Sequence, residues 1–110
     1  MLLQKYKIIN LKTNKATVAT SVDLVNESID DISIKNPNYK FLESTGFIDM
    51  FDTMIFDGDI LKTNLGVNFE VRKYKNYWII NEENYPKNVE ELTQDFIDSN
   101  EAEIIGNLYY

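Results

Sequence analysis

Residues 41–61 constrain the fold of this 110-residue chain more than any other segment. Two glycine-marked turns, Ser44-Thr-Gly46 and Asp57-Gly58-Asp59, separate runs of apolar and β-branched residues. We expect the turns to bound three short strands, over residues 39–42, 53–56 and 60–63. An apolar connector over residues 47–51 should join the first strand to the second. Short strands with closely spaced turns indicate a small β-sheet or barrel.

Alternation predicts a β-hairpin immediately after this block. A turn at 64–66 leads into residues 67–74, which alternate apolar and polar with period two, and Lys75-Asn76 then suits a tight turn into a partner strand at 77–81. In the two strands, Phe69 shares a face with Val71, and Trp78 shares a face with Ile80. We expect these four side chains in the core.

Both ends of the chain also favour strands. Residues 5–11 and 16–20 are rich in β-forming residues and flank a polar turn at 12–15, which predicts an N-terminal hairpin. Residues 102–110 predict a last strand, interrupted at 105–107 and tied into the sheet.

A helix is predicted after Pro86. Asn88 suits its N-cap and Glu91, three residues later, completes a capping-box pattern. Val89, Leu92 and Phe96 form its apolar stripe, and Ser99-Asn100 ends it.

The segment 21–32 admits two interpretations. Its apolar residues recur every three or four positions, as on one face of a short helix, but β-branched residues are frequent enough that a strand stays open. The fold class that we expect is mostly β (α+β). The expected architecture is a single domain over residues 1–110: a small curved sheet or partly closed barrel, with one C-terminal helix packed on it and a short N-terminal helix at 21–32.

Composition excludes several functional classes. The chain has no cysteine and no histidine, which removes thiol nucleophiles, disulfides, His-dependent triads and the usual zinc ligands. The four glycines are not clustered as phosphate or dinucleotide loops require. No signal-peptide core opens the chain, and no apolar run approaches the roughly 20 residues of a membrane span. We expect a cytoplasmic protein that is not an enzyme and takes no cofactor and no membrane partner.

Acidic residues gather at the C-terminal end. Charges cancel over residues 1–80, whereas residues 81–110 hold one lysine against eight carboxylates and account for the whole net charge of −7. One interpretation is a solvated helix that aids solubility, and the other is a surface for a basic host protein. The partner-binding candidates are Glu82, Glu83, Glu90, Glu91, Asp95 and Asp98. Nucleic acid is a disfavoured partner, because binders of phosphate concentrate charge of the opposite sign.

The tip of the predicted hairpin at 67–81 is the second candidate. Its residues combine cationic, amide and aromatic side chains that suit nucleic-acid stacking or a small anionic ligand: Arg72, Lys73, Tyr74, Lys75, Asn76 and Tyr77. The alternatives to a protein binder are therefore a weak nucleic-acid-binding barrel and a homo-oligomeric sponge for a nucleotide signal.

Four aspartates lie between residues 49 and 59, namely Asp49, Asp52, Asp57 and Asp59. An EF-hand loop would need further acidic residues at alternating positions and a closing glutamate, which are missing. We expect turn carboxylates that accept hydrogen bonds from backbone amides, and no metal site.

Three blocks of the chain, at residues 6–15, 42–60 and 103–109, together resemble the YopX family of small phage and prophage proteins. The first, Tyr6-Lys-Ile-Ile-Asn-Leu-Lys-Thr-Asn-Lys15, is similar to the family's opening strand and turn. The central block, Leu42-Glu-Ser-Thr-Gly-Phe-Ile-Asp49 with Ile55-Phe-Asp-Gly-Asp-Ile60, resembles "Tyr-Thr-Gly-Leu-Lys-Asp … Ile-Tyr-Glu-Gly-Asp-Ile". Glu103-Ile-Ile-Gly-Asn-Leu-Tyr109 resembles the closing "Val-Ile-Gly-Asn-Ile-Tyr".

The chain departs from the family pattern at Met50-Phe-Asp-Thr53, where Asp-Lys-Asn-Gly is usual, and over residues 18–38. The resemblance implies a mostly-β phage protein and brings no catalytic residues. Our hypothesis is a non-catalytic accessory protein that binds a host protein, such as a counter-defence inhibitor.

Overall fold

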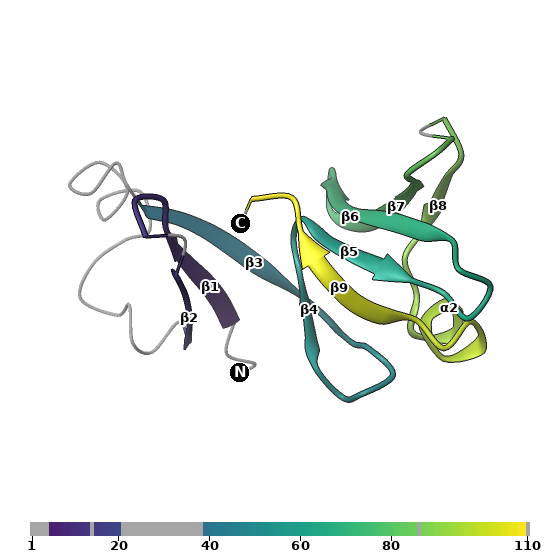
Figure 1. Cartoon of the computed structure of the whole chain (residues 1–110), viewed down its shortest axis with the longest axis horizontal. Helices are drawn as coiled ribbons and strands as arrows, with labels where there is room; N and C mark the ends of the chain where they lie inside the picture. Colours follow the sequence, from purple (N-terminus) through teal and green to yellow (C-terminus); the bar gives the residue numbers. More distant parts are fainter. Residues whose placement is uncertain (1–4, 14, 21–38, 86, 110) are drawn as a thin grey trace. The chain divides into compact units, whose positions relative to one another are not determined.

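The structure is a computed structural model that describes residues 5–13, 15–20, 39–85 and 87–109. The described residues form nine strands and one short helix, so the mostly-β prediction is confirmed (Figure 1). The chain divides into two compact units, residues 1–44 with residue 110, and residues 45–109. The predicted N-terminal helix at 21–32 lies outside the described residues.

The predicted N-terminal hairpin is confirmed in the first unit. Strand β1 (Lys5–Asn10) pairs antiparallel with β2 (Lys15–Thr20), and on its other side with the start of β3 (Tyr39–Ile48). The side-chain oxygen of Asn10 accepts hydrogen bonds from the backbone N–H groups of Lys12 and Thr13, which stabilises the turn.

The turn predicted at residues 44–46 is wrong, because β3 runs through it from the first unit into the second. Gly46 has a φ of +83°, which glycine adopts readily, and the strand continues through this residue. The Thr45 hydroxyl donates to the Ile55 carbonyl at 2.8 Å, which links β3 to β4 (Met54–Phe56). The chain reverses at Asp49–Thr53 instead, where the Asp49 N–H donates to the Thr53 carbonyl.

The second unit contains a five-stranded antiparallel sheet that curls into a half-barrel (Figure 1). Its strand order is β8-β7-β6-β5-β9. Its strands are β5 (Asp59–Lys62), β6 (Asn68–Tyr74), β7 (Tyr77–Glu82), β8 (Val89–Glu91) and β9 (Glu103–Asn107). The predicted tight turn between β6 and β7 is confirmed, with Lys75 at a φ of 56°.

The core of this unit lies between the sheet and helix α2 (Gln94–Ser99). Its buried side chains are Ile55, Leu61, Val71, Ile80, Leu92, Ile97 and Ala102. Phe69 and Trp78 pack against these residues, which confirms the predicted inward faces of β6 and β7. Ile97 of α2 is fully buried in the same cluster, so the predicted packing of a C-terminal helix on the sheet is also confirmed.

The predicted start of this helix is wrong. Val89–Glu91 form strand β8, in which Glu91 pairs with Ile79 of β7, and the helix begins only at Gln94. Its N-cap is Thr93, whose hydroxyl accepts from the Phe96 N–H at 3.1 Å. Threonine is a preferred N-cap residue. A helix capped by Thr93 leaves Val89–Glu91 available to complete the sheet. The predicted end at Ser99-Asn100 is confirmed.

The last strand joins two segments far apart in sequence. Strand β9 pairs with β5, with a bulge where Ile60 faces Gly106 and Leu61 faces Ile104. The fully buried Asp59 carboxylate accepts from the Phe56 N–H at 2.7 Å and from the Asn107 side-chain amide at 2.9 Å. The predicted tie of the C-terminal segment into the sheet is therefore confirmed.

Candidate functional site

The six predicted partner-binding carboxylates all belong to the second unit but come from several elements. Glu82 ends β7 and Glu83 follows it, while Glu90 and Glu91 lie on β8. Asp95 and Asp98 lie on α2. The expectation that one acidic helix carries Glu90 and Glu91 together with Asp95 is wrong, because the first two are strand residues.

Strand geometry separates the two β8 carboxylates. Consecutive residues of a strand point to opposite faces of the sheet. Glu90 faces the fully buried Ile80 across the ladder, and Glu91 faces Ile79 on the other side of the sheet. Both glutamates are nevertheless exposed, because β8 is an edge strand. The edge of the sheet is thus acidic on both of its faces.

On the helix, Asp95 and Asp98 are three residues apart and therefore lie on one side. The side-chain amide of Gln94 bonds to Ile48 twice, accepting from its N–H at 3.1 Å and donating to its carbonyl at 2.9 Å. The same amide nitrogen of Gln94 donates to Asp98 at 3.0 Å. These contacts fix the first turn of the helix against the end of β3.

The carboxylates differ in whether other groups of the protein form hydrogen bonds or ion pairs with them. Glu82 accepts a hydrogen bond from the Asn88 side chain at 3.2 Å, and Asp98 accepts the one from Gln94. Within the described ranges, four of the six form no hydrogen bond or ion pair: Glu83, Glu90, Glu91 and Asp95.

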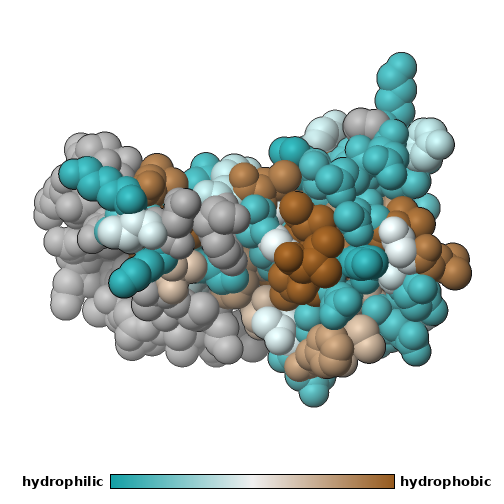
Figure 2. Space-filling view, in the orientation of Figure 1, coloured by the Kyte–Doolittle hydropathy of each residue, from teal (hydrophilic) through white to brown (hydrophobic). Residues whose placement is uncertain are grey.

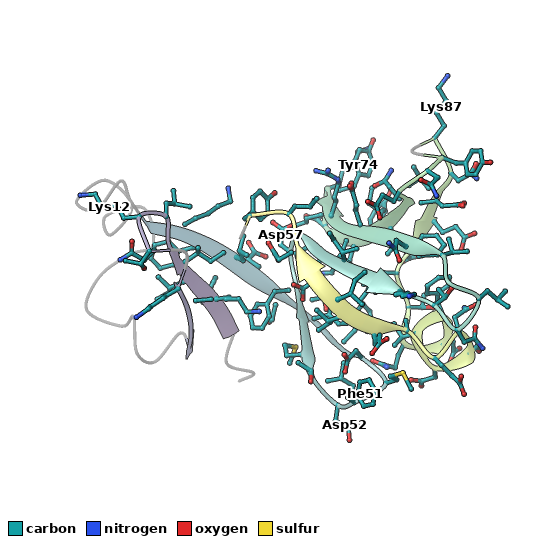
Figure 3. The ribbon with its side chains drawn as sticks, viewed as in Figure 1. Lys12, Phe51, Asp52, Asp57, Tyr74 and Lys87 are labelled. Carbon is teal, nitrogen blue, oxygen red and sulfur yellow. The ribbon has the colours of Figure 1, made fainter. Side chains whose placement is uncertain are left out.

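Lys87 is the one cationic residue in the sequence from 81 to 110. It is exposed and projects from the loop that precedes β8 (Figure 3). The carboxylates of this region therefore have little opposite charge nearby in sequence.

The second candidate site, at the β6–β7 turn, brings its predicted aromatic residues together. The rings of Tyr74 and Tyr77 meet edge to face with centroids 5.7 Å apart, and the two residues are 49% and 42% exposed. Lys75 places its Nζ 5.4 Å from the Tyr74 ring centroid, and Lys73 lies 5.8 Å from that of Trp78. Figure 3 shows Tyr74 where β6 ends.

Arg72 and Asn76 complete this predicted patch. Arg72 donates to Glu70 at 2.9 Å, so part of its charge is neutralised on the same strand. Asn76 is exposed in the turn. The net positive charge of the patch is therefore lower than its own cationic residues alone would suggest, because Glu70 offsets Arg72.

Two of the four clustered aspartates have structural roles. Asp49 Oδ1 accepts from the N–H groups of Phe51 and Thr53, both at 2.9 Å, and its Oδ2 accepts from Ile104 at 3.1 Å. Asp59 accepts the buried hydrogen bonds from Phe56 and Asn107. The interpretation of Asp49 and Asp59 as turn carboxylates is confirmed. In the described part of the chain, no group of three or more Asp, Glu, His or Cys residues is arranged to hold a metal ion.

Exposed apolar side chains occur on the same unit. Figure 2 shows a hydrophobic patch over the region where β9 runs in Figure 1, and Ile105 and Leu108 are 48% and 37% exposed. Among the described residues, no helix has the length and apolar character needed to span a membrane.

Strand β8, which forms one edge of the sheet, was not predicted from the sequence. Thr93 was the available signal, because it is a strong N-cap residue with an acidic residue in the turn that follows. A helix that begins after Thr93 leaves Val89–Glu91 free to pair with β7. Without that pairing, the sequence alone does not favour Thr93 over the predicted cap, Asn88.

The comparison with protein families gives one result that spans both units. The family model described as "YopX protein" matches residues 3–110. None of the curated proteins compared matches the chain. The resemblance inferred from the three sequence blocks is confirmed.

Proposed function

Because the chain belongs to the YopX family, a family of small phage-type proteins, we propose that it is a non-catalytic accessory protein of a phage or prophage. It acts in the host cytoplasm by binding a host protein with a basic surface. More specifically, the protein is a counter-defence inhibitor whose carboxylates imitate the charge of nucleic acid.

The observation that carries this proposal is the set of carboxylates that the protein leaves unengaged. Glu83, Glu90, Glu91 and Asp95 are exposed and make no ion pair with any described residue. A charged group that its own protein does not neutralise is available to a partner. Complementary charge raises the rate of encounter and disfavours partners of the wrong sign.

The distribution of charge between the two units supports the same region. Residues 45–109 carry thirteen carboxylates and five cationic side chains, a net charge of −8. Residues 1–44 carry five carboxylates and six cationic side chains, a net charge of +1. The second unit would therefore attract a basic partner and repel phosphate.

Support for a non-catalytic role comes from the chemistry of the side chains. The sequence offers no histidine or cysteine as a base or nucleophile. Both oxygens of each buried carboxylate, Asp49 and Asp59, accept hydrogen bonds from N–H groups of the protein itself. A general acid or base needs a carboxylate with an accessible proton site.

The test compares two variants with the same change in net charge. Glu90→Gln/Glu91→Gln/Asp95→Asn removes three negative charges from β8 and α2. Asp52→Lys/Leu65→Lys changes the net charge by the same amount at two exposed loop positions, of which Asp52 is labelled in Figure 3. Each tagged protein is expressed in host cells, and captured proteins are quantified by mass spectrometry.

We expect the neutralised variant to lose a captured basic protein that the wild type and the loop variant retain. Raising the salt concentration should weaken capture by the wild type as well. Equal capture by all three proteins would refute a role for these carboxylates.

The exposed Tyr74–Tyr77 pair favours a second candidate, a site for a small anionic ligand or a single nucleic-acid strand. Stacking on these rings, supported by Lys75, would supply such binding, and an oligomer would enclose a ligand more fully. Nucleotides should then raise the melting temperature of the wild type and not that of Tyr74→Leu/Tyr77→Leu. Single-stranded DNA retained on a filter at low salt would indicate the nucleic-acid form instead.

A further inference from the structure

Strand β8 forms one edge of the five-stranded sheet, and its ladder shows which backbone groups face outward. The Leu92 N–H donates to the Trp78 carbonyl at 2.9 Å, and the Glu82 N–H donates to the Asn88 carbonyl at 3.2 Å. In an antiparallel ladder, hydrogen-bonded pairs recur at every second residue. The pair Glu90–Ile80 lies midway between these two and is therefore hydrogen-bonded as well.

The residues on either side of Glu90 consequently direct their backbone groups away from β7. The N–H and C=O groups of Val89 and Glu91 point to the open side of the edge. Nothing in the described part of the chain forms a hydrogen bond with them. An exposed row of such groups can pair with another extended chain.

The opposite edge of the same sheet is treated differently. Next to β9, the Met50 N–H donates to the Ala102 carbonyl at 2.9 Å. The Asp49 carboxylate accepts from the Ile104 N–H at 3.1 Å. The loop after β3 therefore occupies outward groups of the β9 edge, whereas β8 keeps its own available.

We propose that β8 binds an extended segment of a basic protein as a sixth strand of the sheet. The partner's backbone would pair with Val89 and Glu91. The side chains define the sequence it should carry: an apolar residue opposite Val89, which is 49% exposed, and basic residues opposite Glu90 and Glu91. The basic character of the partner rests on the proposed function, while the pairing of strands rests on the ladder.

The pattern gives a defined probe. A peptide with the sequence Thr-Lys-Lys-Val-Lys-Lys-Thr presents the same residues to β8 in either strand direction. Methylating the backbone nitrogens of its second, fourth and sixth residues removes alternate donors and keeps every charge. A peptide with glutamate in place of lysine controls for the sign of the charge.

The matched protein variants are Val89→Pro and Val89→Ala. Proline removes the outward N–H of Val89, and it is tolerated on an edge strand where that group takes no part in the ladder. Alanine shortens the same side chain and keeps the N–H. Neither substitution changes the net charge.

Binding by the 110-residue chain is followed through the fluorescence of Trp78, its single tryptophan, and through amide hydrogen exchange. We expect the lysine peptide to bind and to slow exchange at Val89 and Glu91, with little change at Glu90. Val89→Pro should weaken binding about fivefold relative to Val89→Ala, the effect of one lost backbone hydrogen bond. The methylated peptide and the glutamate peptide should bind the wild-type protein no more tightly than the lysine peptide binds Val89→Pro.

If the methylated peptide bound wild-type protein as tightly as its parent, strand addition would be overturned. This comparison does not require the proline variant to fold. Absence of lysine-peptide binding, or slower exchange at Glu90 alone, would overturn it too. The host-protein capture experiment judges the proposed function separately, because side-chain charge can hold a partner without any pairing of strands.

Discussion

Two regions of the second unit treat their acidic residues in opposite ways. Where β5 meets β9, Asp59 is fully buried and each of its oxygens accepts a hydrogen bond. Around β8 and α2, the side chains of Glu90, Glu91 and Asp95 are exposed, and their carboxylates take no partner among the described residues. In the first region acidic residues specify the fold, and in the second they are available to another molecule.

This contrast explains why the family is easier to identify than the function. The central and closing sequence blocks meet at Gly58, Asp59, Asn107 and Tyr109. Family resemblance is thus carried by residues that join two distant segments of the sheet. The proposed binding region lies outside those blocks, so the family match does not define its partner.

The largest effect is expected at Asp59. Asp59→Ala would leave the Phe56 N–H and the Asn107 amide without their buried acceptor. We expect a loss of about 4 kcal/mol in the free energy of unfolding, since each unsatisfied buried group costs about 1–3 kcal/mol. Urea denaturation followed by Trp78 fluorescence measures it. A loss below about 1 kcal/mol would remove the contrast between the two regions.

Gly58→Ala should have the next largest effect. Gly58 has a φ of +83°, and an added Cβ would lie 2.5 Å from the Tyr109 ring. Backbone strain and overpacking together should reduce the unfolding free energy by about 3 kcal/mol. Gly46 has the same φ and open space around it, so Gly46→Ala should cost about 1 kcal/mol.

A double-mutant comparison separates the two terms at Gly58. Adding Tyr109→Ala to Gly58→Ala should relieve the overpacking and leave the backbone strain. The second substitution should therefore cost less in the Gly58→Ala background than in the wild type. Additive losses would show that the ring moves aside without resistance.

Sequence patterns predicted most of the second unit because their signals are local. Period-two alternation placed Phe69, Val71, Trp78 and Ile80 in the core, and the turns at Gly58 and Gly66 followed from glycine itself. Positive φ values at both glycines agree with these predictions.

The failures occurred where distant contacts decide between two local preferences. Gly46 was expected to turn the chain, but the pairing of β3 with β4 carries the strand through it. Val89 and Leu92 fit a helical stripe, but pairing with β7 makes the first of them part of a strand. The open edge of β8 could not be predicted from the sequence for the same reason. Only the ladder shows that the groups of Val89 and Glu91 face outward.

The start of α2 offers a smaller test of this contrast between local preference and pairing. Thr93→Ala removes the oxygen that accepts from the Phe96 N–H, and should reduce the unfolding free energy by about 1 kcal/mol. Asn88→Ala, at the cap suggested by the sequence, should cost less, because Asn88 precedes β8 and its exposed side chain donates one hydrogen bond, to the carboxylate of Glu82. Thermal unfolding of the two variants compares them directly. A larger loss at Asn88 would favour a helix that starts before residue 94.

The smallest effect on stability is expected from Glu90→Gln/Glu91→Gln/Asp95→Asn, the variant expected to change partner binding most. These side chains are exposed and have no partner in the described structure, so their neutralisation should alter the unfolding free energy by no more than about 0.5 kcal/mol. The net charge changes from −7 to −4, so weaker self-repulsion should offset the interaction that Asp95 loses with the positive first turn of α2. Urea denaturation at low and high salt measures both the size and the salt dependence. A loss above about 1 kcal/mol would mean that these carboxylates hold the fold together as Asp59 does, and any loss of partner capture could then be a consequence of unfolding.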